Sequence, residues 1–321
     1  MISIIMIVYD VEKYVERSIQ SVLNQTYSDI ELIIVADHGP DGSEEICKRY
    51  ADQDPRIKLI TGDAKGIADA RNRGMEAVTG DWLGFVDSDD YIEPAMFESM
   101  LSNMEKYDAD ISICGRFYEY MNATLSDTPK PPVVMTGEEA IEVTLGHDGF
   151  FLHCWDKLFS RRVFEGLHFR TDVTVEDRIV VDTLLSKADR VVYDPTPMYH
   201  FRERSGSNSK RSGMIRNNVE ANLLMDEYIR TNHPSLEEKL DAFMLYEFIT
   251  AIQNELVLPN PDREDLKKYK AKVKEIAGNF RFGADKTLKI KTFMALHMPY
   301  ILKVYTKRSQ SRTASKLERF P

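Results

Sequence analysis

Three carboxylates occur within four residues, in the segment Asp87-Ser88-Asp89-Asp90, directly after the apolar run 82–86. Carboxylates this close repel one another unless a cation or hydrogen-bond donors offset their charge. Oxygen ligands of this kind suit Mg²⁺ or Mn²⁺, which also bind phosphate oxygens. We therefore expect a divalent cation to bind here. For Asp90 we accept the simpler alternative, a cap of the helix that contains Pro94, but that role leaves the other two carboxylates unexplained.

A second pair of acids, Glu176-Asp177, comes just before an apolar-periodic run at Val180, Leu184 and Leu185. This spacing predicts that Asp177 lies at the amino terminus of a helix, where the helix dipole helps to keep a carboxylate ionised. An aspartate with an ordinary pKa of ~3.9 is deprotonated at neutral pH and can accept a proton from a hydroxyl group. From these residues alone, an acidic first helical turn is the preferred interpretation of the pair.

Basic side chains gather in the turn-rich segment 199–211, which contains Arg202, Arg204, Lys210 and Arg211. Arginine presents parallel donors to phosphate oxygens, so such a loop can close over a diphosphate. The competing interpretation is a basic loop that is simply solvated. Upstream, Trp155 is equally consistent with stacking on a sugar and with a place in the core.

These residues lie in a pattern of short apolar runs that alternate with amphipathic segments. The runs 2–9, 31–36, 57–60 and 82–86 predict strands, and the segments between them have helical spacing of apolar residues. This alternation predicts an α/β fold with a mostly parallel sheet. Ligands of such sheets bind beyond the carboxyl ends of the strands, where Asp37 and Asp87 are expected. Asp10 is expected to cap the first helix.

Composition excludes several classes of function. The chain has 321 residues, with 42 Lys and Arg against 52 Asp and Glu, and its net charge of −10 disfavours general nucleic-acid binding. Three cysteines are too few for a disulfide framework or a zinc site, so we expect reduced thiols in a cytoplasmic protein. The first residues lack a basic region, so we expect no signal peptide, and no apolar run reaches the ~20 residues of a membrane-spanning helix. No Gly-x-Gly-x-x-Gly motif follows the first strand, which disfavours a dinucleotide-binding domain.

The charge is unevenly distributed along the chain. Residues 286–321 hold nine Lys and Arg and one acidic residue, interleaved with apolar side chains such as Phe293 and Tyr300. A basic amphipathic segment of this kind is typical of a peripheral contact with a membrane surface. The alternative is a helix packed on its neighbours, with its lysines in solvent.

Several segments occur in the order in which glycosyltransferase family 2 has them, and over about the first 207 residues the chain resembles that family of inverting sugar transferases. The matching segments are 3–9, 21–26, Asp37 with 41–43, 70–74, 84–90, 155–159, 176–177 and 199–207. The resemblance implies a GT-A fold, a Rossmann-like and mostly parallel central sheet flanked by helices. It divides the chain into a catalytic domain at 1–212 and a helical extension at 213–321. Within the domain, 1–110 is the nucleotide-binding half and 111–212 the acceptor-side half.

The resemblance implies a role for each residue of a donor site that holds a UDP-sugar. Asp37 accepts a hydrogen bond from the uracil imide, which a carboxylate can do. Val8 and Tyr9 lie against the base, and Arg71 lies near the nucleotide. Asp87 reaches the ribose. Asp89 binds the Mn²⁺ or Mg²⁺ ion that bridges the diphosphate and stabilises its departure.

On the acceptor side the resemblance makes Asp177 the catalytic base, which deprotonates an acceptor hydroxyl as it attacks the anomeric carbon. Glu176 and Trp155 are expected to contact the acceptor. The loop residues Arg202, Arg204 and Ser207 are expected to contact the diphosphate. The chain departs from the family pattern in having Asp10 in place of asparagine, and at 36–40, 64–65 and 155–157.

Together these features predict an inverting glycosyltransferase that moves a hexose or N-acetylhexosamine from a UDP-sugar to a glycan or lipid-linked acceptor, in the synthesis of a cell-surface polysaccharide such as a capsule. We expect it in the cytoplasm, peripheral to the inner face of the membrane. Two alternatives stay open: a transferase with a non-UDP donor, and a non-catalytic partner subunit that binds nucleotide sugar or glycan. The sequence also leaves the oligomeric state open.

Overall fold

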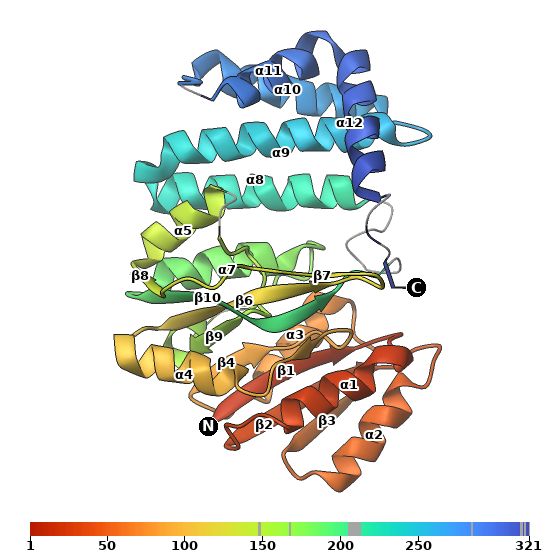
Figure 1. Ribbon diagram of the computed structural model, residues 1–321, viewed down its shortest axis with the longest axis vertical. Helices are drawn as coiled ribbons and strands as arrows, with labels where there is room; N and C mark the ends of the chain where they lie inside the picture. The colour runs from red at the N-terminus through yellow and green to blue at the C-terminus, as the bar shows by residue number, and fades with distance from the viewer. Residues whose placement is uncertain are drawn as a thin grey trace. The chain divides into compact units, whose positions relative to one another are not determined.

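The computed structural model describes residues 1–146, 149–166, 168–204, 213–283, 285–314, 317 and 319–320 (Figure 1). The chain divides into two compact units. The first, here called the sheet unit, comprises residues 1–120 and 124–203. The second, the helical unit, comprises residues 121–123 and 204–321. The predicted α/β architecture with a helical carboxy-terminal region is confirmed.

Four strands of the sheet unit form a parallel block in the order β3–β2–β1–β4. Their bounds are β1 (Ile2–Val8), β2 (Ile30–Asp37), β3 (Ile57–Gly62) and β4 (Trp82–Phe85). The continuous apolar sequences of β1 and β2 are buried on both faces, as parallel strands covered by helices require. All four strands end at one edge of the sheet, which we call the carboxyl edge.

Beyond β4 the sheet continues through a reversed strand. The order is β9 (Lys157–Ser160), β6 (Ile111–Glu119), β10 (Val191–Arg202) and β5 (Tyr91–Ile92). β9 runs antiparallel to β4 and to β6, whereas β6 and β10 are parallel. The first residues of β9 therefore lie at the carboxyl edge, where β4 ends. The short strands β7 (Thr124–Ser126) and β8 (Val133–Met135) pair antiparallel with β6 and β10.

Side-chain alternation along β1 assigns the first helices to the two faces of the sheet. Ile2, Ile4 and Met6 share one apolar cluster with residues of α1 (Glu12–Leu23), α2 (Ser43–Gln53) and α4 (Met96–Tyr107). The other face is covered by α3 (Ile67–Glu76), where a side chain at Gly74 would lie 2.9 Å from Cγ2 of Ile5. The remaining helices of the unit are α5 (Gly137–Leu145), α6 (Arg161–Phe164) and α7 (Glu176–Lys187).

The expectation that Asp10 caps α1 is wrong. Asp10 has φ of 55°, in the left-handed region, and turns the chain between β1 and the helix. The donors at the start of α1 are satisfied from a distant loop instead: the amide of Val11 donates to Oγ of Ser43 over 2.9 Å, and that of Glu12 donates to Oδ2 of Asp41 over 2.7 Å. The segment 41–43 thus fixes the loop that follows β1.

The helical unit is organised around one long helix. It comprises α8 (Met214–Asn232), the 3₁₀ helix η2 (Pro234–Leu236), α9 (Glu237–Val257), α10 (Arg263–Asn279), α11 (Lys286–His297) and α12 (Pro299–Ala314). α9 contacts α8, α10, α11 and α12, and it buries Leu240, Phe243 and Met244. In the part of the chain that the structure describes, no helix has the length and apolar character needed to cross a membrane.

Glu31, a buried carboxylate on β2, stabilises the sheet unit in a pH-dependent way. Glu31 is 5% exposed and bonds Ser3, Thr79 and Lys58. Burial opposes its ionisation, but these donors outweigh burial and lower the pKa to about 2 from an ordinary 4.5. Because the folded pKa is depressed, the stabilisation is present above pH 4.5 and is lost as pH falls toward 2.

We therefore expect Glu31→Gln to lower the free energy of unfolding at pH 7 by on the order of 2 kcal/mol. Urea unfolding at a series of pH values measures the difference between the variant and the wild type. The difference should shrink between pH 4.5 and pH 2, as the wild-type carboxylate takes up a proton. An unfolding difference that is constant across this range contradicts the assignment.

Candidate active site

Segments distant in sequence meet at the carboxyl edge of the sheet unit. β4 ends just before Asp87, and the reversed strand β9 begins just after Trp155. α7 leads directly into β10 and brings Asp177 in its first turn. Asp87 interacts electrostatically with both Asp177 and His153, so these side chains are neighbours. The fold thus brings together the two acidic segments that the sequence singled out.

The carboxylates of Asp87, Asp89 and Asp90 form a cluster whose oxygens lie within 4.8 Å of one another. Burial raises the pKa of Asp87 to about 6; Arg71 counteracts this rise, while Asp89 and Asp177 add to it. Such mutual repulsion is relieved by a cation. Because the donor set consists only of oxygen atoms, it fits the Mg²⁺ or Mn²⁺ that the sequence predicts.

Asp90 is not a helix cap, and this alternative from the sequence is wrong. Its side chain is 1% exposed and accepts two hydrogen bonds, from the hydroxyl of Tyr199 over 3.0 Å and from the amide of Arg202 over 2.7 Å. The Tyr199 hydroxyl also accepts from the amide of Asp87 over 3.1 Å. Arg202 donates from its guanidinium to the carbonyl of Asp89 over 2.6 Å. Asp90 therefore joins the acidic loop to the end of β10.

Helix α3 holds the two sides of the site together through three consecutive residues. Arg71 is 7% exposed and forms an ion pair with Glu176. Asn72 both donates to and accepts from the backbone of Phe169, over 2.9 and 2.8 Å. Arg73 lies 3.6 Å from Asp37 and donates to a carbonyl of β3. The segment 70–74 thus links the ends of β2 and β3 to the residues before and at the start of α7.

Asp177 is a partly exposed carboxylate whose pKa is lowered. Its side chain is 16% exposed, and its Oδ2 lies 3.4 Å from Nδ1 of His153. Burial opposes ionisation, but His153 and the charge of Arg71 outweigh it and lower the pKa of Asp177 to about 2. By contrast, burial raises the pKa of Glu176 to about 7; Arg71 opposes this rise and Asp177 adds to it. Of the two acids, Asp177 is therefore the one that favours the ionised form at neutral pH.

His153, which contacts Asp177, belongs to a stack of aromatic rings. The ring of Trp155 is stacked on Tyr199 at 4.3 Å and on His153 at 5.2 Å between centroids, and the residue is only 5% exposed. This arrangement favours the core role for Trp155 that the sequence left open. The outermost ring is His153, whose side chain is 45% exposed. His153 therefore covers the indole and is the ring that a bound molecule would meet.

The expected base-binding residues lie at the ends of β1 and β2. Val8 is buried, whereas Tyr9 is 50% exposed. Asp37 accepts a hydrogen bond from the amide of Ala64 over 3.0 Å. Burial raises the pKa of Asp37, and Ala64 and Arg73 counteract this rise.

Two predicted loop residues, Arg204 and Ser207, fall outside the described part of the sheet unit. Ser207 lies outside the described residues, and Arg204 belongs to the helical unit, where it forms a β-bridge with Phe320. Two residues of the site were missed: His153, and Tyr199 as a partner of the acidic loop. His153 has no sequence signal, because its partner Asp177 is 24 positions away.

Comparison with known proteins agrees with this geometry. The pattern described as glycosyl transferase family 2 matches residues 3–167. The uncharacterised glycosyltransferase EpsJ of Bacillus subtilis is 36% identical over 215 residues, which are 64% of this chain and 62% of EpsJ. The chain spans between about a third and about three fifths of the length of the first curated relatives that it matches.

Solved structures share the fold at low sequence identity. TarS of S. aureus, residues 1–349 in complex with UDP-GlcNAc, superposes with a TM-score of 0.71 at 16% identity, over 98% of this chain and 91% of that one. A mannosyltransferase of Pyrobaculum calidifontis, in complex with GDP-Man and Mn²⁺, gives a TM-score of 0.58 at 17% identity, over 98% and 86%. The chain therefore has the GT-A fold and belongs to glycosyltransferase family 2.

Proposed function

We propose that the protein is an inverting glycosyltransferase that moves a hexose or N-acetylhexosamine from a UDP-sugar to a hydroxyl of a glycan or lipid-linked acceptor. The observation that carries the proposal is the proximity of the ionised Asp177 to Asp87, with Arg71 between the two halves of the site. A cell-surface polysaccharide such as a capsule is the proposed product, made at the cytoplasmic face of the membrane.

At the donor end, Asp37 supplies a carboxylate that can read an imide N–H of the base. The exposed ring of Tyr9 offers an apolar face to the same base, and Val8 supports it from the end of β1. Asp87 would accept a hydrogen bond from a ribose hydroxyl. Asp89, with the neighbouring carboxylates, would hold the divalent cation, which as a Lewis acid would stabilise the leaving diphosphate.

At the acceptor end, Asp177 takes the proton of the attacking hydroxyl while the new glycosidic bond forms and the bond to the diphosphate breaks. A single displacement of this kind inverts the anomeric centre, and its transition state has oxocarbenium character. His153 keeps Asp177 oriented and ionised, so we propose it as a positioning residue. Glu176 forms an ion pair with Arg71, so it is not the base. We assign Glu176 to binding of the acceptor.

The two alternatives, a transferase with a non-UDP donor and a non-catalytic partner subunit, are not equally supported. A guanosine donor has one specific observation in its favour, since the mannosyltransferase neighbour was solved with GDP-Man. A non-catalytic partner subunit has less support, because it has no need of an ionised carboxylate beside a cation cluster. The residues expected to do chemistry, Asp89 and Asp177, are both present.

Replacement of Asp177 by asparagine tests the base. We expect Asp177→Asn to lower turnover by roughly 10²–10⁴-fold, the usual contribution of a general base, with nucleotide affinity unchanged. Release of nucleoside diphosphate in the presence of acceptor measures the first quantity and calorimetry the second. Asp52→Asn, at an exposed position on α2, is the matched control and should behave as wild type. Equal turnover in the Asp177 variant would falsify the assignment.

Removal of the proposed cation ligand Asp89 should eliminate the metal dependence of the reaction. We expect Asp89→Ala, and chelation by EDTA in the wild type, to abolish Mn²⁺- or Mg²⁺-dependent release of UDP from the donor. Titration of Mn²⁺ into the wild type should restore activity, whereas titration into the variant should not. A variant that keeps its metal response would show that the cluster at 87–90 does not hold the cation.

The nucleotide preference can be measured without knowing the sugar. Calorimetry with UDP, GDP, CDP and dTDP, each with and without Mn²⁺, should give the tightest binding for UDP in the presence of the cation. Asp37→Ala should reduce the preference for UDP over CDP, because cytosine lacks the imide N–H. Tightest binding of GDP would replace the UDP donor with the guanosine alternative.

A further inference from the structure

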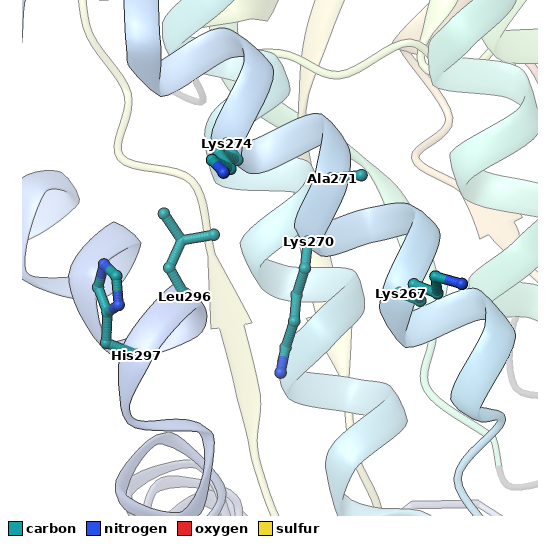
Figure 2. Close-up of a pocket in the computed structure, with 6 residues that line it drawn as sticks. All are labelled: Lys267, Lys270, Ala271, Lys274, Leu296 and His297. Atoms are coloured by element: carbon teal, nitrogen blue, oxygen red, sulfur yellow. The ribbon is translucent and has the colours of Figure 1, made fainter.

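The helical unit contains a pocket lined by lysines that the transfer reaction does not use. It is lined by Lys267, Lys270, Ala271 and Lys274 of α10 and by Leu296 and His297 of α11, and its volume is about 460 Å³ (Figure 2). Figure 2 shows the lysines along one helix and Leu296 and His297 on the next helix, across the pocket. We call it the lysine pocket.

Among the residues that the structure describes, no lysine of the lysine pocket lies within ion-pairing distance of a carboxylate. Some other cations of the same unit are paired: Arg230 contacts Asp226 and Asp241, and Lys272 contacts Glu275. Because the lysines are three and four positions apart, they share one face of α10 and repel one another. An anion bound between them would relieve that repulsion.

Large apolar side chains adjoin the pocket on α11 and α12. The buried sides of these helices carry Leu288, Thr292, Ala295, Leu302 and Thr306. Their other sides expose Ile290 (58%), Phe293 (55%), Tyr300 (78%), Ile301 (45%) and Tyr305 (51%). The ring of Phe293 lies 4.9 Å from that of His297, which lines the pocket, so the apolar surface and the pocket are continuous.

Charge identifies the partner of this surface. Residues 266–308 contain twelve Lys and Arg and two acidic residues, in a chain whose net charge is −10. The rest of the chain is therefore strongly acidic and would be repelled by an anionic surface that attracts this segment. Exposed tyrosines and aliphatic side chains mixed with lysines are the composition of an interfacial surface, where the cations reach phosphates and the apolar groups enter the headgroup region.

We propose that the helical unit binds the surface of an anionic phospholipid membrane. The lysine pocket takes the phosphate of a lipid headgroup, and Phe293, Tyr300 and Ile301 enter the headgroup layer beside it. The sequence pattern at 286–321 pointed to such a contact, and the structure adds α10, which lies outside that segment. The inference does not rest on the proposed transfer reaction, because lipid binding is measured without a sugar donor.

The test is co-sedimentation of the full chain with vesicles. We expect binding to phosphatidylcholine vesicles that contain phosphatidylglycerol, little binding to phosphatidylcholine alone, and weaker binding as salt rises. The triple variant Lys267→Gln, Lys270→Gln, Lys274→Gln should bind roughly a hundredfold more weakly. A control with the same loss of charge, Lys13→Gln, Lys106→Gln, Lys130→Gln in the sheet unit, should bind like the wild type.

A second variant tests whether exposed apolar side chains contribute to binding, which distinguishes a lipid surface from a soluble anion. Phe293→Ser with Tyr300→Ser should weaken vesicle binding about tenfold or more and leave the fold intact, because both side chains are exposed. If inorganic phosphate or RNA competes fully, or if the control triple loses as much binding as the pocket triple, the proposal fails. Release of UDP from a soluble donor should be unchanged in the pocket triple, so failure of lipid binding and failure of the transfer reaction are told apart.

Discussion

The structure of the site depends on the charge balance between its neighbouring carboxylates and the buried Arg71. Asp87, Glu176 and Asp177 are close enough to shift one another's pKa, and the positive charge of Arg71, which is almost fully buried, acts to lower the pKa of all three. An arginine in this position must be held rigidly, because a displaced guanidinium would leave acids unpaired in a low-dielectric setting. The neighbours of Arg71 on α3 provide that rigidity: Asn72 clamps a backbone segment on the acceptor side, and Arg73 reaches β3 and Asp37.

The reversed strand β9 explains why segments so far apart in sequence can meet. In an all-parallel sheet, the residues before a strand lie at the amino edge, away from the ligand. Because β9 runs antiparallel to β4, the residues before it, including His153 and Trp155, lie at the carboxyl edge instead. Lys157, fully buried at its start, then donates to the carbonyls of Phe151 and His153 over 2.6 and 2.7 Å and fixes the approach to that edge.

Periodicity and spacing were enough to predict the parallel strands, the acids at their ends and the helix that begins at Glu176, because each of these is a local property of the chain. The failures involve partners that are distant in sequence. Asp90 is engaged by Tyr199 and Arg202, more than 100 positions away, and Asp177 by His153 on a loop with no regular pattern. The departure from the family at Asp10 has a local reason: the backbone there is left-handed, and aspartate and asparagine both adopt that conformation more readily than other non-glycine residues.

The distribution of charge links donor binding to the cation. A nucleoside diphosphate is itself anionic, and the carboxyl edge that would receive it carries three clustered carboxylates and a net excess of acid. Arg71, the buried cation beside these carboxylates, is already paired with Glu176. A divalent cation among Asp87, Asp89 and Asp90 would reverse the local field, and a bound diphosphate would in turn raise the affinity of the site for the cation. By linkage the two effects are equal in free energy, so neither ligand binds at full affinity in the absence of the other.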